Sequence, residues 1–167
     1  MPILMSTARG AAGGGARIWT IGYEKAGFSA FIATLRAAGI RMVIDIRDLP
    51  LSRRAGFSKR QLAAGLDEAG IAYLHLKALG TPAAGRAANR RRQWPLFWQI
   101  VEESLARPEA HAALEDAAGV AAATPSALLC YEAEACTCHR RRVGEMLAAR
   151  HGFAVENLRV GAEFEPR

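Results

Sequence analysis

Short apolar segments alternate with helical patterns along most of this chain, and that alternation restricts the possible folds more than any other feature. Buried-type strands are expected at residues 18–23, 42–46, 71–76, 127–131 and 154–160. Between them apolar residues recur at helical spacing, and Gly39, Gly70 and Gly152 stand where helices should end. Parallel strands need crossover connections, so the pattern predicts a three-layer α/β fold with a mainly parallel sheet of about five strands and helices on both faces.

Two local patterns add detail to the expected helices. Ser58 and Gln61 have the spacing of a capping box, which predicts that a helix starts there. Trp94, Phe97 and Trp98 stand at helical spacing, which predicts that this aromatic stripe packs into the core.

The chain is long enough for one domain with a normal core. Residues 1–16 are rich in Gly and Ala without apolar periodicity and are interpreted as a disordered leader, leaving 17–167 as a single α/β domain. The apolar runs are too short for a membrane span and no secretory signal is evident, so we expect a cytoplasmic protein without a membrane partner. An odd count of three cysteines argues against a disulfide framework and favours a reducing compartment.

The formal net charge is +6, which points towards an anionic partner. The chain holds only three lysines, at positions 25, 59 and 77, whereas Ala, Gly and Arg are abundant. Such a bias can reflect codon composition, so the local arrangement of arginines should count for more than their total.

Polar residues follow the expected strands at the positions where an open parallel sheet binds ligands, beyond its carboxyl ends. Candidate ligand-binding residues are Asp45, Arg47, Ser52, Arg53 and Arg140. Arginine suits this role because its planar fork can hold two anionic oxygens at once. For Asp45 and Arg47 an ion pair that orders the loop is an equally supported alternative.

The fourth strand leads into the most specific pattern of the chain. Candidate catalytic residues are Cys130, Glu132, Cys138, His139 and, after the third strand, His75. A helix start and nearby cations stabilise a thiolate, so Cys138 beside His139 and Arg140 could have a lowered pKa. Packing alone could explain Cys130, and His75 alone is more often structural.

A zinc site formed by Cys130, Cys136, Cys138 and His139 is chemically possible, although its spacing matches no recognised structural pattern. The sequence therefore assigns no metal ligand and no cofactor.

With these segments identified, the chain resembles domain-of-unknown-function family 488, the bacterial and archaeal group that includes YeaO-like proteins. The resemblance rests on Thr20-Ile21-Gly22, Asp45-Ile46-Arg47, Pro50, Ser52, Arg53, Phe57, Tyr73, His75, Leu79-Gly80, and Cys130-x-Glu132 leading to Cys138-His139-Arg140. The chain departs from the family pattern at Tyr23, Glu24 and Thr81. The resemblance implies a site at the shared residues and names no reaction. A strand ending in cysteine before a helix is also similar to rhodanese and cysteine-phosphatase sites, an analogy of fold.

Three functions remain open from the sequence. The first is an enzyme-like domain, such as a cysteine-dependent hydrolase or transferase, that binds a small anionic or nucleotide-like ligand at the carboxyl edge of the sheet. The second is a nucleic-acid-binding or regulatory module that uses Arg53, Arg54, Lys59, Arg60 and the Arg90–Arg92 run. The third is a metal-binding protein built on the cysteines.

Overall fold

The computed structural model describes residues 15–161, so most of the expected leader, residues 1–14, lies outside the described residues. The strands are β1 (Arg17–Gly22), β2 (Met42–Asp45), β3 (Ala72–His75), β4 (Ser126–Cys130) and β5 (Ala154–Arg159). The α-helices are α1 (Phe28–Ala37), α2 (Lys59–Glu68), α3 (Ala83–Arg90), α4 (Trp94–Leu105), α5 (Pro108–Ala123) and α6 (His139–His151). The expected strand–helix alternation is confirmed.

The five strands form one sheet in the order β3-β2-β4-β1-β5, and every neighbouring pair is parallel. β4 lies between β2 and β1, with Asp45 opposite Leu129 and Gly22 opposite Cys130. The carboxyl ends of these three strands therefore meet at one place. The sequence predicted a mainly parallel sheet, and the sheet is wholly parallel.

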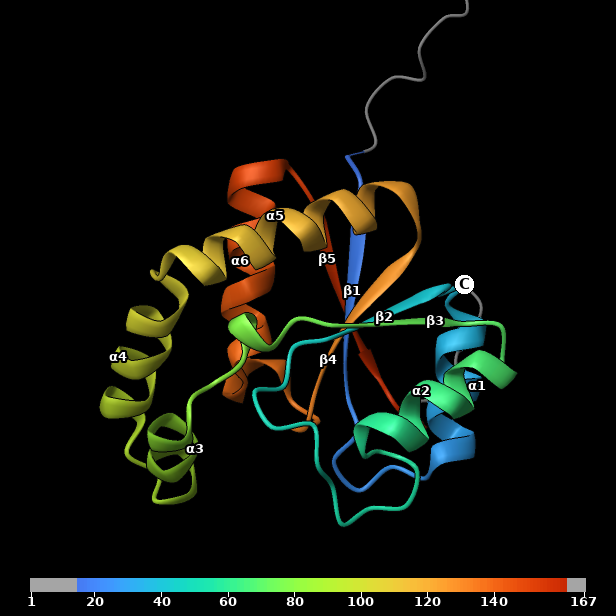
Figure 1. Cartoon of the computed structure of the whole chain (residues 1–167), viewed down its shortest axis with the longest axis horizontal. Coiled ribbons are helices and arrows are strands. Elements are labelled where there is room, and N and C mark those ends of the chain that lie inside the picture. The colour runs from blue at the N-terminus through green and yellow to red at the C-terminus, as the bar shows by residue number, and fades with distance from the viewer. Residues whose placement is uncertain (1–14, 162–167) are drawn as a thin grey trace, which may run out of the picture.

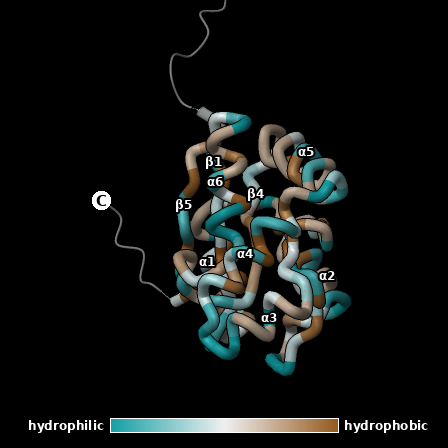
Figure 2. The backbone as a smooth tube through the Cα atoms, turned by 90° about the vertical axis from the view of Figure 1, so that its left-hand side faces the viewer, coloured by the Kyte–Doolittle hydropathy of each residue, from teal (hydrophilic) through white to brown (hydrophobic). Residues whose placement is uncertain are grey.

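Helices cover both faces of the sheet, as expected (Figure 1). Val43 and Leu129 pack on one face with α1 and α2, whereas Ile44 and Leu128 pack on the other with α4, α5 and α6. Successive residues of β1, β2 and β4 thus point into two separate cores, which is why these strands read as mainly apolar runs, whereas most of β5 is exposed. Hydrophilic segments lie mainly at the periphery of the molecule (Figure 2).

Three helices are followed by glycine, as the sequence predicted. Gly39, Gly70 and Gly152 have positive φ values of 73°, 74° and 72° just after helices, a conformation that glycine adopts without steric cost. The expected helix start is confirmed, since Ser58 is the N-cap residue of α2, but the capping-box bond is wrong: the Ser58 hydroxyl bonds the backbone of Ser52 instead of α2.

The structure also changes the expected role of the aromatic stripe in α4. Phe97 is buried and Trp98 half-buried, as predicted, but Trp94 is 42% exposed at the start of the helix. The helix α3 before it was not expected at all. In the part of the chain that the structure describes, no helix is long and apolar enough to cross a membrane.

The topology opens a crevice beside the carboxyl ends of β1 and β4. β1 leads through α1 towards β2 over one face, whereas β4 leads through α6 towards β5 over the other. Connections that leave neighbouring strands in opposite directions open a gap beyond their carboxyl ends. Cys130 ends β4 at this point.

Candidate functional site

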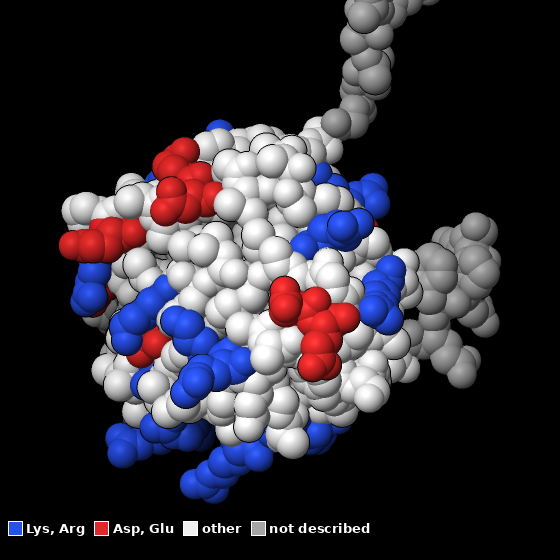
Figure 3. Space-filling model, turned by 45° about the vertical axis from the view of Figure 1, so that its right-hand side comes forward, with Lys and Arg blue, Asp and Glu red and all other residues white. Residues whose placement is uncertain are grey.

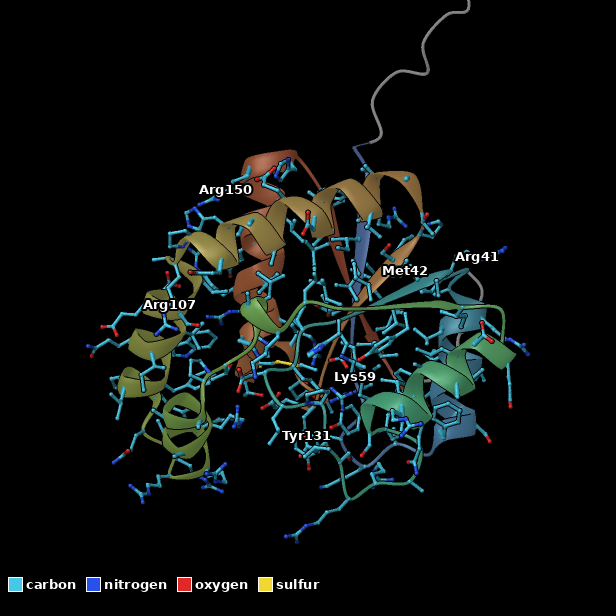
Figure 4. The ribbon with its side chains drawn as sticks, viewed as in Figure 1. Arg41, Met42, Lys59, Arg107, Tyr131 and Arg150 are labelled. Carbon is cyan, nitrogen blue, oxygen red and sulfur yellow. A yellow bond between two sulfur atoms is a disulfide. The ribbon has the colours of Figure 1, made fainter. Side chains whose placement is uncertain are left out.

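A cleft of about 1250 Å³ opens at the carboxyl edge of the sheet. Its walls come from the loops after β1, β2 and β4 and from the segment that joins α3 to α4. Of the predicted site residues, Arg47, Ser52, Arg53, Cys130, Glu132 and His139 line it. Tyr131 lies at this end of the molecule, and Arg41 lies at the far end of β2 (Figure 4).

Asp45 and Arg47 form a buried ion pair beneath the cleft. The Arg47 Nε and Nη2 atoms donate to the two carboxylate oxygens of Asp45 at 2.9 and 2.7 Å, and its Nη1 donates to Tyr23 and to the Phe57 carbonyl. Tyr73 donates a 2.6 Å hydrogen bond to the same carboxylate. Burial lowers the pKa of Arg47, but the bonds to Asp45 outweigh it and raise the pKa overall. Through these hydrogen bonds the ion pair at the end of β2 links β3 to the loop that follows β1.

His75 stands apart from the cysteine segment. Its Nε2 lies 2.7 Å from the Arg47 carbonyl oxygen, and its Nδ1 lies 3.3 Å from the Lys59 ammonium group. A carbonyl oxygen only accepts, so Nε2 carries the hydrogen. His75 does not line the cleft, and the geometry gives it a positioning role on the loop after β2.

Cys130 and Cys138 meet below the cleft, and the structure joins their sulfur atoms as a disulfide (Figure 4). The sequence predicted free thiols in both places. Their Cα atoms are 7.5 Å apart, whereas disulfides usually span about 4.4–6.8 Å. Cys136, which the zinc alternative included, is exposed and unpaired with either cysteine.

Glu132 lies beside the cysteine pair at the base of the cleft. Its Oε2 lies 3.4 Å from Cys130 Sγ, and its Oε1 accepts a 3.1 Å hydrogen bond from Asn89 in α3. Burial raises the pKa of Glu132, partly offset by the nearby Arg140 charge. A carboxyl group in this setting can exchange a proton with a neighbouring group more readily than a solvated one.

Arg140 is fully buried and does not face the cleft. Its guanidinium group donates to the Thr20 hydroxyl at 3.1 Å, to Cys130 Sγ at 3.0 Å, and to the carbonyls of Glu132 and Ala133. Burial lowers its pKa to about 10, so the group stays charged near neutral pH. The sequence predicted an anion ligand here; the structure uses the same planar fork to hold the turn between β4 and α6.

Gly22 explains why β1 ends as it does. A Cβ atom at this position would collide with the Glu132 carbonyl oxygen and would lie 2.7 Å from Arg140 Nη1. The Thr20-Ile21-Gly22 segment therefore supplies one acceptor to Arg140 and leaves room for its guanidinium group.

His139 begins α6 and is buried against β2. Its Nε2 lies 3.0 Å from the Ile46 carbonyl oxygen, and its Nδ1 lies 3.6 Å from Cys138 Sγ. Burial lowers the pKa of His139 to about 4, so the ring is neutral near pH 7. It therefore supplies no positive charge to Cys138, whose sulfur instead accepts a bond from the Arg140 backbone N–H at the start of α6.

The α3–α4 wall supplies cleft residues that strand-end reasoning missed. Arg86 binds Asp48 and the Thr81 carbonyl, and Asn89 reaches Glu132. Trp94 also lines the cleft. The only signal in the sequence was the Arg90–Arg92 run, which follows an alanine-rich stretch without large apolar residues.

Taken together, the fold and the site define an all-parallel, three-layer α/β domain with a buried cysteine–histidine group and a glutamate at its carboxyl edge. The chain belongs to the family described as domain of unknown function DUF488, whose model matches residues 27–147. This confirms the resemblance seen in the sequence, and the match includes the segment from Cys130 to Arg140. No curated protein and no solved structure matches the chain.

Proposed function

We propose that the protein is an enzyme-like domain that binds a phosphorylated, nucleotide-like ligand in the cleft. The observation that carries this proposal is the combination of free arginines and exposed aromatic rings along one cavity. Arg53 comes from the loop after β2, and Arg90 and Arg92 come from the α3–α4 segment. Among the described residues, none of these three side chains forms a hydrogen bond or an ion pair.

Arginines outnumber carboxylates among the residues that line the cleft, which leaves its net charge positive, and each of these carboxylates already has a partner. Asp48 pairs with Arg86, Glu24 accepts the Ala133 backbone N–H, and Glu132 accepts from Asn89. Basic side chains also gather along the lower edge of the molecule (Figure 3). Free guanidinium groups at a cavity suit phosphate oxygens, which accept two parallel hydrogen bonds from one arginine.

Apolar surface in the same cleft favours a nucleotide over a simple anion. The residues Leu49, Leu51, Trp94 and Tyr131 are large, exposed and apolar, and all four line the cavity. Nucleobases stack on exposed aromatic rings, and the phosphates of the same ligand would meet the arginines. The buried cysteine–histidine group and Glu132 at the base are then the groups placed to act on the ligand.

Replacing Arg53 or Arg90 with alanine is expected to weaken nucleotide binding about tenfold each, because each change removes a charged hydrogen-bond donor. The measurement is equilibrium titration with labelled nucleoside mono-, di- and triphosphates at several salt concentrations. Arg41→Ala is the matched control, since Arg41 is equally exposed but lies at the opposite end of β2.

Several outcomes of that titration would decide between ligands. The absence of salt-sensitive binding to any nucleotide would contradict the proposal, because ionic contacts must weaken as salt increases. Much tighter binding of single-stranded oligonucleotides than of mononucleotides, with a steep salt dependence, would identify nucleic acid as the ligand instead.

Replacing Trp94 with alanine is expected to weaken binding of nucleoside triphosphates by about 1–3 kcal/mol, the usual contribution of base stacking. Binding of inorganic tripolyphosphate should stay unchanged, because it has no base. Leu96→Ala is the control: Leu96 is 44% exposed on the same helix but does not line the cleft. An equal loss for both ligands would show that Trp94 supports the wall rather than a base.

A further inference from the structure

Three buried donor atoms converge at the base of the cleft. The sulfur atoms of Cys130 and Cys138 and a ring nitrogen of His139 all lie within 4.8 Å of one another. We propose that the reduced pair of cysteines and His139 bind one zinc ion, with a fourth coordination position open to the cleft. The proposal does not depend on which ligand the cleft binds.

The spacing of the Cys138 and His139 donors fits a tetrahedral ion, whereas the two sulfur atoms, bonded to each other in this structure, must separate on reduction to share the ion. Zinc–sulfur and zinc–nitrogen bonds of about 2.3 and 2.0 Å at a tetrahedral angle place the two donor atoms about 3.5 Å apart. Cys138 Sγ and His139 Nδ1 are 3.6 Å apart. Two thiolates and one imidazole form a soft donor set that zinc prefers over magnesium or calcium.

The tautomer of His139 is fixed in the form that a metal needs. The Ile46 carbonyl oxygen can only accept, so His139 Nε2 carries the hydrogen of that 3.0 Å bond. The Nδ1 lone pair is therefore free on the side of Cys138. Metal-binding histidines usually have their second nitrogen held in this way by a carbonyl or carboxylate.

The charge of Arg140 gives an independent reason for a thiolate at Cys130. Buried charges are normally paired, and within the described residues Arg140 forms no ion pair with a carboxylate within 4 Å, although the Glu132 charge is near enough to raise the Arg140 pKa. Its closest sulfur contact is Cys130 Sγ, at 3.0 Å from Nη1. A thiolate would neutralise the buried cation, whereas a disulfide sulfur carries no charge.

The backbone spacing points in the same direction. The Cα separation of 7.5 Å between Cys130 and Cys138 exceeds the usual range for disulfides, so a relaxed disulfide would require the backbone to move. Two cysteines that share an ion need no such approach, because the ion stands between their sulfur atoms. The Arg140 backbone N–H also bonds Cys138 Sγ at 3.4 Å, as expected for a thiolate at a helix start.

The site has an open side. Cys130 and His139 both line the cleft, and Glu132 Oε2 is 3.4 Å from Cys130 Sγ. Three protein ligands with a free fourth position are typical of catalytic zinc sites, where the ion activates a water molecule. The carboxylate of Glu132 stands where it could accept a proton from such a water.

The test is elemental analysis of the full chain, purified under reducing conditions without a histidine tag. We expect about one zinc ion per chain, and addition of Co²⁺ to chelator-treated protein should give the intense thiolate and tetrahedral bands of a cysteine-bound ion. Cys138→Ser and His139→Asn should each lose most of the metal. Cys136→Ser is the matched control and should retain it, because Cys136 is exposed and outside the group.

A thiol assay on wild-type protein keeps the test independent of whether the variants fold. Zinc should slow alkylation of two cysteines in the native protein, and all three should react after unfolding in a chelator. A protein that holds no zinc, shows no Co²⁺ bands and exposes only one reactive thiol after unfolding would overturn the proposal in favour of a stable disulfide. Equal metal content in the Cys138, His139 and Cys136 variants would also overturn it.

Discussion

Replacing Asp45 with asparagine is expected to lower the free energy of unfolding by about 3–5 kcal/mol, the usual cost of breaking a buried ion pair. Asp45 is fully buried and accepts hydrogen bonds from the side chain and the backbone N–H of Arg47 and from Tyr73. Asparagine keeps one oxygen but turns an N–H group towards these donors. The Arg47 charge would then remain buried without a partner.

Urea unfolding followed by tryptophan fluorescence measures this loss directly. Tyr73→Phe is the matched control, because it removes one hydrogen bond to the same carboxylate and should cost only about 1 kcal/mol. If Asp45→Asn also cost no more than the control, the ion pair would not be what holds the loop after β2. The ligand-binding role that the sequence left open for Asp45 would then deserve a direct binding measurement.

The fold was predictable because β1, β2 and β4 are largely buried on both faces. Val43 and Ile44 enter different cores, so β2 is apolar from Met42 to Ile44, up to the buried Asp45 that ends it, and is easily recognised. Once the strands were recognised, their carboxyl ends were known, and Arg47 and Cys130 could be placed at those ends. The segment around Cys130 could be identified as a site because parallel strands bring their carboxyl ends to one edge.

The α3–α4 wall could not be predicted from periodicity. α3 buries Gly85 and Ala88, and a Cβ at Gly85 would meet the Thr81 and Ile100 side chains. A helix that packs through small residues leaves no stripe of large apolar side chains to detect. Trp94 shows the opposite limit: its spacing matches the core stripe, but it is the first residue of α4, 42% exposed, and lines the cleft.

The burial of the Arg140 side chain could have been inferred, although its place at the start of the helix after β4 suggested a ligand contact. Arg140, Val143 and Leu147 follow one another at three and four residues, which is the spacing of one helix face. Val143 and Leu147 are fully buried, so Arg140 enters the interior with them. The sequence pattern thus indicates that the Arg140 side chain is buried. Only the structure shows that it donates hydrogen bonds to sulfur and carbonyl groups.

Replacing Arg140 with lysine is expected to lower the free energy of unfolding by about 3 kcal/mol or more, because lysine cannot reproduce the planar fork. Thr20, the Glu132 carbonyl and the Ala133 carbonyl all accept from different nitrogen atoms of this one guanidinium group. A single ammonium group cannot reach all of them. The unpaired acceptors would stay buried, each costing about 1–3 kcal/mol.

The two neighbouring arginines of α6 serve as matched controls for this prediction. Arg141 and Arg142 follow Arg140 on α6, but their side chains are 46% and 34% exposed and form ion pairs with surface glutamates, and Arg141 also lies over the Trp98 ring, a contact that lysine can keep. Lysine at either position should change stability by no more than about 0.5 kcal/mol. Urea unfolding of the three single variants therefore compares one substitution in three environments. Similar midpoints for all three would contradict the interior role of Arg140, whereas a large loss at Arg140 alone would show that this guanidinium holds the cysteine segment against β1.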